Sequence, residues 1–579
     1  MELAVAMSIA RLSRESKRQL GQFLTPRAIV ADIVKRLNVS EKHTVLEPSF
    51  GEGVFIFEVV SSLAQRLTRE QLRTWVHTNL YGCEIDHRAY MAFASKWEQL
   101  QLGELPRNIE CCDFFRWLPF GYDRTNAIDW RRYFASHLEC FDLILGNPPF
   151  GGSIDPLIQD ELDSIFGFRN GMKIKKETYA FFIVKSVDLL KPCGRLCFIC
   201  SDTILTIATM KGLRNLLHNT CDVQVSSLPK GFEDTTQDMV LITLTKQERR
   251  PSHISVFGQS TQIADIETTG NLSWRVNGEF ARYFTGKTLG EKMVATSGMT
   301  VGKNDLFLRK ISEGQIHEPY EFSFSHEPIT LEREIAKARL GKISLAKREK
   351  ILEQEQRGDT QKVVQWTLRD TPKVISIPNQ DYRYYNKAAR QIVYCAPQWV
   401  IFWRDNGGYV YTYKKTGNWY LRGVGGKPYF GREGFTWALI APHFRTRYLP
   451  AGYILDSGAP CAFLRDGVEY DELFFIMGWT LTDLCNKILK GVINHTRNIQ
   501  SKDFERLPYP IWVSSHDKEN ATQHMRQILD AALHGSRFDF DSPEITKLNE
   551  FYEYRESHLF TPPKPVIHQH QPVQLPLSI

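Results

Sequence analysis

Long apolar runs are missing from this 579-residue sequence, and none approaches the ~20 residues that a membrane-spanning helix needs. The first 20 residues, MELAVAMSIARLSRESKRQL, start apolar and then become charged, which is the reverse of a secretory signal. Hydrophobic residues make up 42% of the chain and charged residues 24%, both ordinary fractions for a soluble protein. We therefore expect a cytoplasmic protein that binds no membrane.

Cysteine is scarce: the 11 residues are an odd number and are scattered along the chain, which argues against a disulfide scaffold. The tightest group, Cys193, Cys197 and Cys200, has no second ligand pair nearby, as a structural zinc site would require. We expect these thiols to be buried on a strand, and we expect no metal. The GxGxxG fingerprint and the Lys-Ser/Thr pair of a phosphate-binding loop are missing too, which argues against a phosphate site.

The chain is too long for one hydrophobic core, because single cores stop growing at roughly 250–300 residues. In residues 1–250, short apolar runs alternate with amphipathic stretches, and this rhythm predicts an α/β domain with a doubly wound, mostly parallel sheet. Beyond residue 250 the rhythm is lost, and glycine and aromatic residues become frequent. We expect a separate α+β domain over 251–515, then a helical segment and an extended Pro- and Gln-rich tail over 516–579.

Each of four early apolar runs, which we expect to be strands, is followed by polar residues or glycine. These runs and the residues after them are 44–46 with Glu47 and Gly51, 80–83 with Glu84, 109–112 with Asp113, and 141–145 with Asn147. In a doubly wound sheet the carboxyl ends of parallel strands share one edge, where ligands bind. One acid after a strand is a weak signal, because many such acids are helix caps, but four signals in register are stronger.

The chemistry of these residues suits a nucleoside. Glycines at 51 and 53 permit a tight turn and close approach of a ligand to the backbone. A carboxylate such as that of Glu84 accepts hydrogen bonds from both ribose hydroxyls. Asp113 is suited to accept from the N6 amine of an adenine, while the Phe114 N–H donates to N1.

The segment Asn147-Pro148-Pro149-Phe150 is the sharpest signal in the sequence. Proline fixes φ, so the two prolines stiffen the turn and hold carbonyls in set directions. The side-chain oxygen of Asn147 and the main-chain oxygen of Pro148 are suited to accept the two protons of an exocyclic amine. The nitrogen lone pair then leaves conjugation with the ring and becomes able to attack a sulfonium methyl group, so catalysis rests on positioning and polarisation. Phe150 offers a ring that stacks on the base.

The order of these segments resembles the γ class of amino-DNA methyltransferases, the TaqI-like adenine-N6 enzymes of type II restriction–modification systems. In that class, a segment similar to Gly21-Gln22-Phe23-Leu24-Thr25-Pro26 precedes the glycine motif, and the recognition domain comes last. The resemblance covers roughly residues 20–247. The glycine motif SFGEG and Phe150 both depart from the commoner residues of the class. The length and layout of the chain also look like the BseCI/ClaI group, which reads ATCGAT.

The resemblance implies a Rossmann-like enzyme that binds S-adenosylmethionine, releases S-adenosylhomocysteine and needs no metal. Its substrate would be N6 of an adenine flipped out of double-stranded DNA, methylated by a monomer in the cytoplasm of a prokaryote. The methylated site would be protected from a cognate restriction endonuclease that is functionally linked but not bound. The cofactor-binding residues implied are Thr25, Glu47, Ser49, Gly51, Glu84, Ile85, Asp113, Phe114 and Asn147. The catalytic residues implied are Asn147, Pro148, Phe150 and Phe232, the last stacking on the flipped base.

Positive charge is concentrated in one part of the second half. Residues 382–450 hold 11 Lys or Arg against two acidic residues, a net charge of +9, and they also hold 18 aromatic residues. A basic, aromatic-rich segment suits a polyanion whose bases can stack. The residues that we expect to contact DNA are Arg383, Arg390, Arg404, Lys414, Lys415, Arg422, Lys427, Arg445 and Arg447.

Other interpretations of the same residues stay open. N4-cytosine methylation shares the amine chemistry, although Asn147 favours adenine or guanine where Ser favours cytosine. Methylation of guanine N2 in RNA, or of glutamine in a protein, also uses an Asn-Pro-Pro-Phe or -Tyr turn, but it leaves the large basic domain unexplained. A specificity subunit without catalysis would need neither this turn nor the acids after the strands.

Overall fold

The computed structural model describes residues 25–117, 139–149, 156–228, 239–276, 278–284, 286–301, 304–328, 362–404, 406–407, 410 and 424–553. The chain forms two compact units. Unit 1 comprises Met1–Gly286 and Gly491–His495, and unit 2 comprises Lys287–Lys490 and Thr496–Ile579. The main segment of unit 1 therefore ends at Gly286, whereas the change of sequence pattern suggested a boundary near residue 250.

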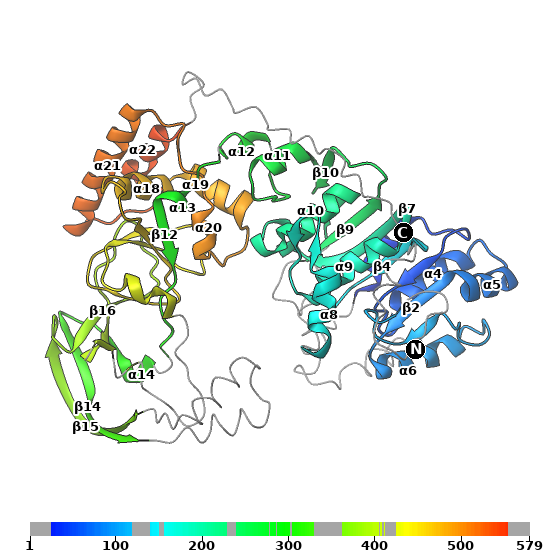
Figure 1. Cartoon of the computed structure of the whole chain (residues 1–579), viewed down its shortest axis with the longest axis horizontal. Coiled ribbons are helices and arrows are strands. Elements are labelled where there is room, and N and C mark those ends of the chain that lie inside the picture. Colours follow the sequence, from blue (N-terminus) through cyan, green and yellow to red (C-terminus); the bar gives the residue numbers. More distant parts are fainter. Residues whose placement is uncertain are drawn as a thin grey trace, which may run out of the picture. The chain divides into compact units, whose positions relative to one another are not determined.

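Unit 1 is built on a large, mostly parallel sheet (Figure 1). Within the described residues its strands follow the order β11-β10-β8-β9-β7-β4-β1-β2-β3. Their bounds are β1 Val45–Glu47, β2 Leu80–Glu84, β3 Ile109–Cys111, β4 Phe141–Gly146, β7 Leu190–Ser201, β8 Cys221–Ser227, β9 Met239–Lys246, β10 His253–Val256 and β11 Gln259–Gln262. Strands β3, β2, β1, β4 and β7 are parallel neighbours, whereas β9 is antiparallel to β7 and β8. Each of the four expected early strands matches one of these to within two residues.

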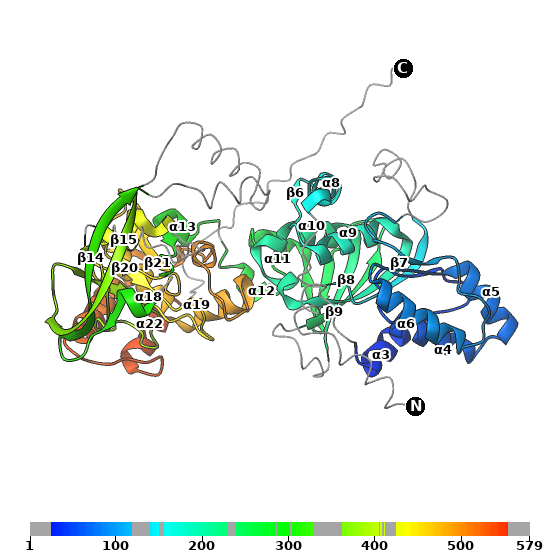
Figure 2. The same ribbon diagram turned by 90° about the horizontal axis from the view of Figure 1, so that it is seen from below.

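Helices cover both faces of this sheet. Their bounds are α3 Arg27–Leu37, α4 Val54–Ala64, α5 Arg69–Asn79, α6 His87–Glu98, α8 Pro156–Phe166, α9 Thr178–Leu189, α10 Lys211–Thr220, α11 Ile263–Thr268 and α12 Gly278–Ala281. In Figure 2, α9 and α10 lie on one side of the sheet and α3 and α4 on the other. Helix α4 shows why: its buried residues, Phe55, Ile56, Val59, Val60 and Leu63, recur at helical spacing and form one apolar face. The doubly wound α/β prediction is confirmed.

The cysteines expected on a strand divide between two environments. Cys197 and Cys200 are buried on β7, as expected. Cys193 is exposed, so the prediction was wrong for this thiol. It precedes the buried part of β7 and has a left-handed backbone, with φ of 62°, which takes it out of the regular alternation of the strand.

Unit 2 combines small sheets with helices. One sheet has the order β12-β21-β18-β19, a second has β13-β17-β16-β20, and β14 pairs with β15 as a long antiparallel two-stranded sheet. The strand bounds are β12 Met293–Thr296, β13 Leu308–Lys310, β14 Gln315–Pro328, β15 Lys362–Ser376, β16 Tyr382–Asn386, β17 Trp399–Phe402, β18 Gly434–Thr436, β19 Arg447–Leu449, β20 Ile454–Leu455 and β21 Cys461–Leu464. The main helices are α18 Glu472–Thr480, α19 Asp483–Ile488, α20 Ser501–Glu505, α21 Ser515–Leu533 and α22 Pro543–Phe551.

The helices at the end of the described chain belong to the core of unit 2. Every residue of α18 is buried, and this helix packs against α21, which in turn packs against α22. Tyr552, directly after α22, is buried and donates from its hydroxyl to the carbonyl oxygen of Phe475 in α18, at 2.5 Å. Across all described ranges, no helix combines the length and the apolar character that crossing a membrane demands.

Candidate active site

The strand order brings four polar strand ends to one edge of the unit 1 sheet. Strand β1 lies between β4 and β2, and β3 comes after β2, all in parallel, so their carboxyl ends share an edge. Glu47 and Glu84 end β1 and β2, Asp113 follows β3, and Asn147 follows β4. The winding of the sheet changes direction between β1 and β4, and doubly wound sheets bind ligands at such a switch point.

The turn after β1 is fastened to the end of β2. Gly51 and Gly53 both have left-handed backbones, with φ of 56° and 84°, which favour glycine. At Gly53 space is also limiting, because a Cβ atom there would lie 2.2 Å from the Phe93 ring. The N–H of Gly51 donates to Oε2 of Glu84 at 2.7 Å. This hydrogen bond therefore holds the glycine turn and the Glu84 carboxylate in a fixed position relative to each other.

Glu84 is only 4% exposed, and its two carboxylate oxygens accept from different backbone groups. Oε2 accepts from Gly51, and Oε1 accepts from the N–H of Asp86 at 2.8 Å. Burial raises the pKa of the Glu84 carboxyl, and the backbone N–H groups oppose that shift. The next residue is Ile85, whose side chain is 65% exposed and leaves an apolar surface beside the carboxylate.

Glu47 is a second buried acid at this edge, with 2% of its surface exposed. Its Oε2 atom has no hydrogen-bond partner among the described residues. Burial raises the pKa of its carboxyl well above the ordinary range, and the nearby Glu84 carboxylate acts in the same direction. A buried carboxylate oxygen without a donor is costly, so Glu47 is well suited to receive a cationic or N–H group from a ligand.

The turn after β3 is organised by Asp113. Oδ1 of Asp113 accepts from the N–H of Phe115 at 2.9 Å. The main-chain oxygen of Asp113 accepts from the N–H groups of Arg116 and Trp117, both at 3.0 Å. Among the described residues, the N–H of Phe114 makes no such bond. That this N–H serves a ligand stays a prediction.

Asn147 lies with two other residues that the sequence analysis singled out. Its Nδ2 donates to Oγ1 of Thr25 at 3.3 Å, and its main-chain oxygen accepts from Oγ of Ser49 at 3.4 Å. Pro148, the next residue, is buried. Residues 122 and 98 positions away from Asn147 in the chain therefore converge on it. Phe150 and Phe232 lie outside the described residues.

Sequence reasoning missed Lys185, which is fully buried in the middle of α9. Its Nζ donates to the main-chain oxygens of the turn after β3, those of Phe114, Phe115 and Trp117. A signal existed: Lys185 is the one charged residue within the apolar run YAFFIVKSV. A lysine flanked by apolar residues on a helix that packs against a sheet requires buried acceptors.

A second missed contact lies where β7 ends. Nε2 of His495 lies 2.5 Å from Oδ2 of Asp202, and Nδ1 lies 2.8 Å from Oγ1 of Thr206. His495 belongs to the short segment Gly491–His495 that returns to unit 1. The pair is separated by 293 residues in the chain, so no local pattern could have indicated it.

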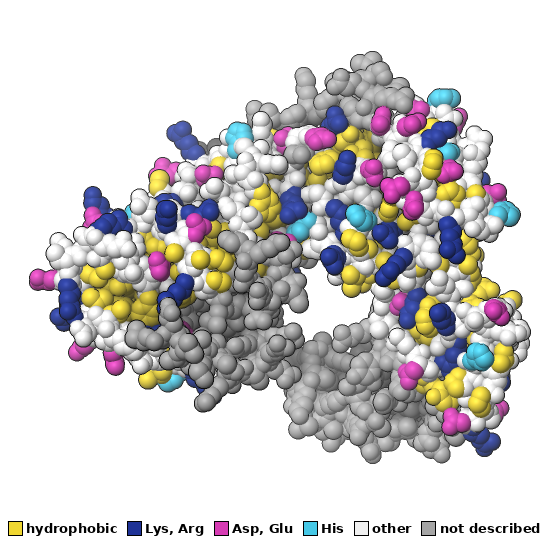
Figure 3. All heavy atoms as spheres, turned by 180° about the vertical axis from the view of Figure 1, so that it is seen from behind, with side chains coloured by type: hydrophobic (Ala, Val, Ile, Leu, Met, Phe, Trp, Pro, Cys, Tyr) yellow, Lys and Arg dark blue, Asp and Glu magenta, His cyan; other side chains and the backbone are white. Residues whose placement is uncertain are grey.

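In unit 2, the basic residues predicted to contact DNA divide by exposure. Arg383, Arg390, Arg404 and Lys427 are exposed, and Arg445 is half-buried. On the face shown in Figure 3, Lys and Arg side chains are scattered among acidic ones and do not form one continuous patch. Three more of the predicted residues, Lys414, Lys415 and Arg422, lie outside the described residues.

Arg447 departs from the prediction, because it is only 3% exposed. Its guanidinium donates to Oδ1 of Asn386 at 3.1 Å and to the main-chain oxygens of Lys387 and Ala389, at 2.5 and 3.3 Å. Burial lowers the pKa of Arg447. This arginine holds the chain after β16 in place and is not available to DNA.

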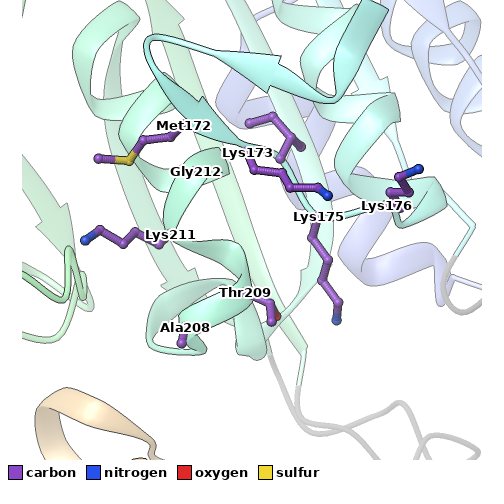
Figure 4. A pocket seen from close by; sticks show the side chains of 9 residues that line it. Met172, Lys173, Lys175, Lys176, Ala208, Thr209, Lys211 and Gly212 are labelled. Carbon is purple, nitrogen blue, oxygen red and sulfur yellow. The ribbon is translucent and has the colours of Figure 1, made fainter. Parts of the chain in front are cut away.

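A cavity of about 530 Å³ lies elsewhere in unit 1, between β6 (Met172–Lys173) and the start of α10 (Figure 4). The lysines that line it are Lys173, Lys175, Lys176 and Lys211. Lys175 pairs with Glu177, and Lys176 pairs with Asp163 at 2.8 Å. Figure 4 shows the labelled amino groups pointing in different directions, so the cavity does not present a single cationic site.

Together, the doubly wound sheet, in which β9 and β11 run antiparallel to their neighbours, and the acids at its carboxyl edge define a Rossmann-like α/β fold. Residues 68–228 match the profile of the Eco57I restriction-modification methylase family. The chain is similar to the type II methyltransferase M.HincII of Haemophilus influenzae, with 27% identity over 208 residues, 35% of this chain and 32% of the relative. It is also similar to M.TthHB8I of Thermus thermophilus, with 26% identity over 281 residues, 47% of this chain and 55% of the relative. The chain thus matches about a third of M.HincII and about half of M.TthHB8I.

Solved structures show the fold over nearly the whole chain. The DrdV–DNA complex, solved by cryo-electron microscopy, covers 92% of this chain and 60% of its own length, with a TM-score of 0.54 and 12% identity. A nuclease-deletion mutant of the Type ISP restriction-modification enzyme LlaGI, in complex with a DNA substrate mimic, covers 88% of this chain with a TM-score of 0.54 and 12% identity. At this identity the likeness concerns the fold alone.

Proposed function

We propose that this chain is a site-specific DNA methyltransferase that transfers a methyl group from S-adenosylmethionine to N6 of a flipped adenine. The observation that carries the proposal is the position of Asn147. The rigid Asn-Pro-Pro turn comes after β4 at the switch point of the sheet, in contact with Thr25 and Ser49 and beside the strands that end in Glu47 and Glu84. The two proposed acceptors for the target amine and the acids proposed to bind the nucleoside thus lie along the same carboxyl edge of the sheet.

The residues at this edge fit the cofactor. Glu47, with a buried oxygen that lacks a donor in the described residues, suits the ammonium of the methionine end, and Thr25 suits its carboxylate. Glu84 suits the ribose hydroxyls, and Asp113 with the Phe114 N–H suits the adenine. The exposed Ile85 side chain provides an apolar surface for the same ring. When bound, S-adenosylmethionine supplies an electrophilic methyl group on a sulfonium.

The contribution of the chain to the reaction is positioning and polarisation. The Asn147 side-chain oxygen and the Pro148 main-chain oxygen accept the two N–H groups of the target amine and so make its lone pair available for attack. The loss of one amine proton to solvent after transfer completes the exchange. Phe150 and Phe232 are proposed to stack on the flipped base, which offsets an unstacking cost of a few kcal/mol.

Duplex DNA is the proposed substrate because similar proteins are type II methyltransferases and because DrdV was solved bound to DNA. The exposed cations of unit 2, Arg383, Arg390, Arg404 and Lys427, together with the half-buried Arg445, are the proposed phosphate or base contacts. We propose action as a monomer on DNA in the cytoplasm, with protection of the site from a cognate restriction endonuclease. N4 of cytosine is the second candidate, because the Asn-Pro-Pro geometry acts on any exocyclic amine.

The test offers tritiated S-adenosylmethionine to the purified chain with DNA, RNA and protein substrates in parallel. We expect label only in DNA, and we expect digestion to deoxynucleosides to place it in N6-methyl-2′-deoxyadenosine. Label in N4-methyl-2′-deoxycytidine would select the second candidate. Label confined to RNA or to protein would overturn the proposal and select a guanine-N2 or glutamine methyltransferase of the same fold. Mapping of modified bases in DNA from expressing cells then gives the recognition sequence.

A further inference from the structure

Lys185 is a fully buried cation outside the proposed cofactor-binding and catalytic residues. Its Nζ donates to the main-chain oxygen of Phe114 at 2.5 Å, of Phe115 at 3.2 Å and of Trp117 at 2.5 Å. It also lies 4.7 Å from the centre of the Phe114 ring, within the range of a cation–π contact. An ammonium carries three N–H donors, so its full capacity is spent on one short turn.

That turn is held from both sides. In a trans peptide the C=O and the following N–H point in opposite directions. The Phe114 carbonyl points to Lys185, and the N–H of Phe115 in the same peptide points to Oδ1 of Asp113. The Phe115 carbonyl also points to Lys185, and the N–H of Arg116 bonds to the main-chain oxygen of Asp113. Lys185 and Asp113 therefore fix the same peptides from opposite faces.

Burial of the Lys185 ammonium costs free energy, and packing alone does not explain why a lysine occupies this position. Moving an ammonium out of water costs several kcal/mol unless strong partners replace the water. An apolar side chain in α9 would avoid that cost, but it would leave three buried carbonyl groups without donors. The lysine thus fixes the conformation of a turn that otherwise has no regular secondary structure to define it.

We infer that Lys185 is a positioning residue for the adenine end of the cofactor, acting through the orientation of Asp113 and of the Phe114 peptide. The inference rests on the proposed function, in which Asp113 and Phe114 hold the adenine. Lys185 itself does not contact the ligand: it lies behind the turn, on α9. Its removal should therefore weaken recognition of the adenine amine more than recognition of the methionine end.

The test measures binding of S-adenosylhomocysteine by calorimetry to the full chain and to Lys185→Met, which keeps side-chain length but donates nothing. We expect the dissociation constant to rise about tenfold or more, since three charge-assisted hydrogen bonds are lost. The matched control is Lys246→Met, because Lys246 also donates to a carbonyl, that of Leu190, at 2.8 Å, at the opposite end of β7. The control should change the dissociation constant by less than about twofold.

A second ligand separates positioning from a general loss of structure. In S-inosylhomocysteine the adenine amine is replaced by an oxygen and N1 carries a proton, so the contacts with Asp113 and with the Phe114 N–H are both lost whatever the variant. If Lys185 acts through those contacts, the penalties of the variant and of the analogue are non-additive, and the analogue binds both proteins within about threefold. Full additivity, or wild-type affinity of Lys185→Met for S-adenosylhomocysteine, overturns the inference. If Lys185→Met does not fold, Lys185→Gln is measured in its place, because its amide still reaches the turn.

If the proposed function itself is wrong, the binding measurements give a different result. If the wild-type chain binds neither S-adenosylhomocysteine nor S-adenosylmethionine, the proposed function is wrong, and the role of Lys185 falls with it. If the wild type binds and Glu84→Ala abolishes binding while Lys185→Met does not weaken it, the cofactor site stands and only the inference about Lys185 is wrong.

Discussion

The charged side chains at the carboxyl edge of unit 1 differ in burial from those of the basic stretch of unit 2, residues 382–450. Glu47 and Glu84 are 2% and 4% exposed, and Glu84 is bonded to backbone N–H groups. Arg383 and Arg404 in unit 2 are exposed, and Arg404 lies 3.6 Å from the acid Asp381. A buried charge with fixed partners acts singly and strongly, whereas exposed charges act together and are screened by salt. Arg447 is an exception, because it lies in the basic stretch of unit 2 but is as buried as the acids of unit 1.

The largest effect is expected at the end of β4. In the proposed mechanism Asn147 is one of two acceptors that polarise the amine, so Asn147→Ala should lower the single-turnover rate of methyl transfer by about 10³-fold. Binding of S-adenosylhomocysteine should change only severalfold, which calorimetry measures. The control is Asn304→Ala on an exposed residue of unit 2. Retention of wild-type activity by Asn147→Ala would place the chemistry elsewhere.

Arg447→Ala tests whether burial or position in the sequence decides the role of an arginine. Three acceptors lose their donor and a cavity remains, so the free energy of unfolding of unit 2 should fall by about 3 kcal/mol. Urea unfolding followed by tryptophan fluorescence measures this loss. A variant as stable as the wild type but weakened on DNA would return Arg447 to the DNA-contacting set.

Glu84→Gln probes the acid that ends β2. The amide nitrogen would face the N–H of Gly51 or of Asp86, so one bond is lost and a donor opposes a donor. We expect the dissociation constant of S-adenosylhomocysteine to rise about 50-fold, equivalent to about 2.3 kcal/mol. DNA affinity, measured in the same preparation by fluorescence anisotropy, should stay unchanged. Loss of DNA binding together with cofactor binding would mean that the glycine turn has a wider structural role.

The pH dependence of stability tests the buried lysine. Burial lowers the pKa of Lys185 to about 8, against about 10.4 in an unfolded chain. Below pH 8 both states are protonated, and between pH 8 and 10.4 the unfolded state binds more protons, so this group favours folding as pH rises. The difference in unfolding free energy between wild type and Lys185→Met should be flat below about pH 7.5 and grow by about 2 kcal/mol by pH 9.5.

Other ionisable groups face Lys185 and enter the control for that measurement. These are Cys83 on β2, Cys112 and Asp113 after β3, and Asp188 on α9. Repeating the comparison in a Cys83→Ala, Cys112→Ala background removes the two thiols whose pKa values also differ from the ordinary value, that of Cys83 being raised by burial and that of Cys112 being lowered by its hydrogen bond with Cys83. A difference that stays flat up to pH 9.5 in this background would show that Lys185 keeps its proton.

The smallest effects are expected for the exposed arginines. Arg404→Ala should leave the unfolding temperature unchanged and weaken DNA binding about threefold to tenfold at low salt. If Arg404 contacts a phosphate, the slope of log K against log salt should fall by about 0.9. If it reads a base, the loss should instead depend on the sequence of the site. A large loss of stability in Arg404→Ala would erase the contrast with Arg447.

The polar residues at the carboxyl edge of the unit 1 sheet were predictable because their signals are local. A short apolar run with an acid or Asn-Pro-Pro directly after it indicates both the end of a strand and the polar group at that end. Glu84, Asp113 and Asn147 all lie where those runs indicated. For the basic stretch, the sequence predicted only a concentration of cationic and aromatic residues. Nothing in the sequence around Arg404 and Arg447 distinguishes an exposed guanidinium from a buried one, because burial depends on tertiary pairing. Strand β17, which ends just before Arg404, pairs with β16, whereas β19, which holds Arg447, pairs with β18.

The sequence by itself determined the alternation of strands and helices in unit 1 and the polar residues at each strand end, because periodicity and turn chemistry act between neighbours in the chain. Tertiary structure alone decided that β1 lies between β4 and β2, that Lys185 reaches the turn of Asp113, and that His495 returns across 293 residues to Asp202. These contacts join segments with no shared local pattern. Their existence depends on the way the whole chain excludes water and satisfies its buried polar groups.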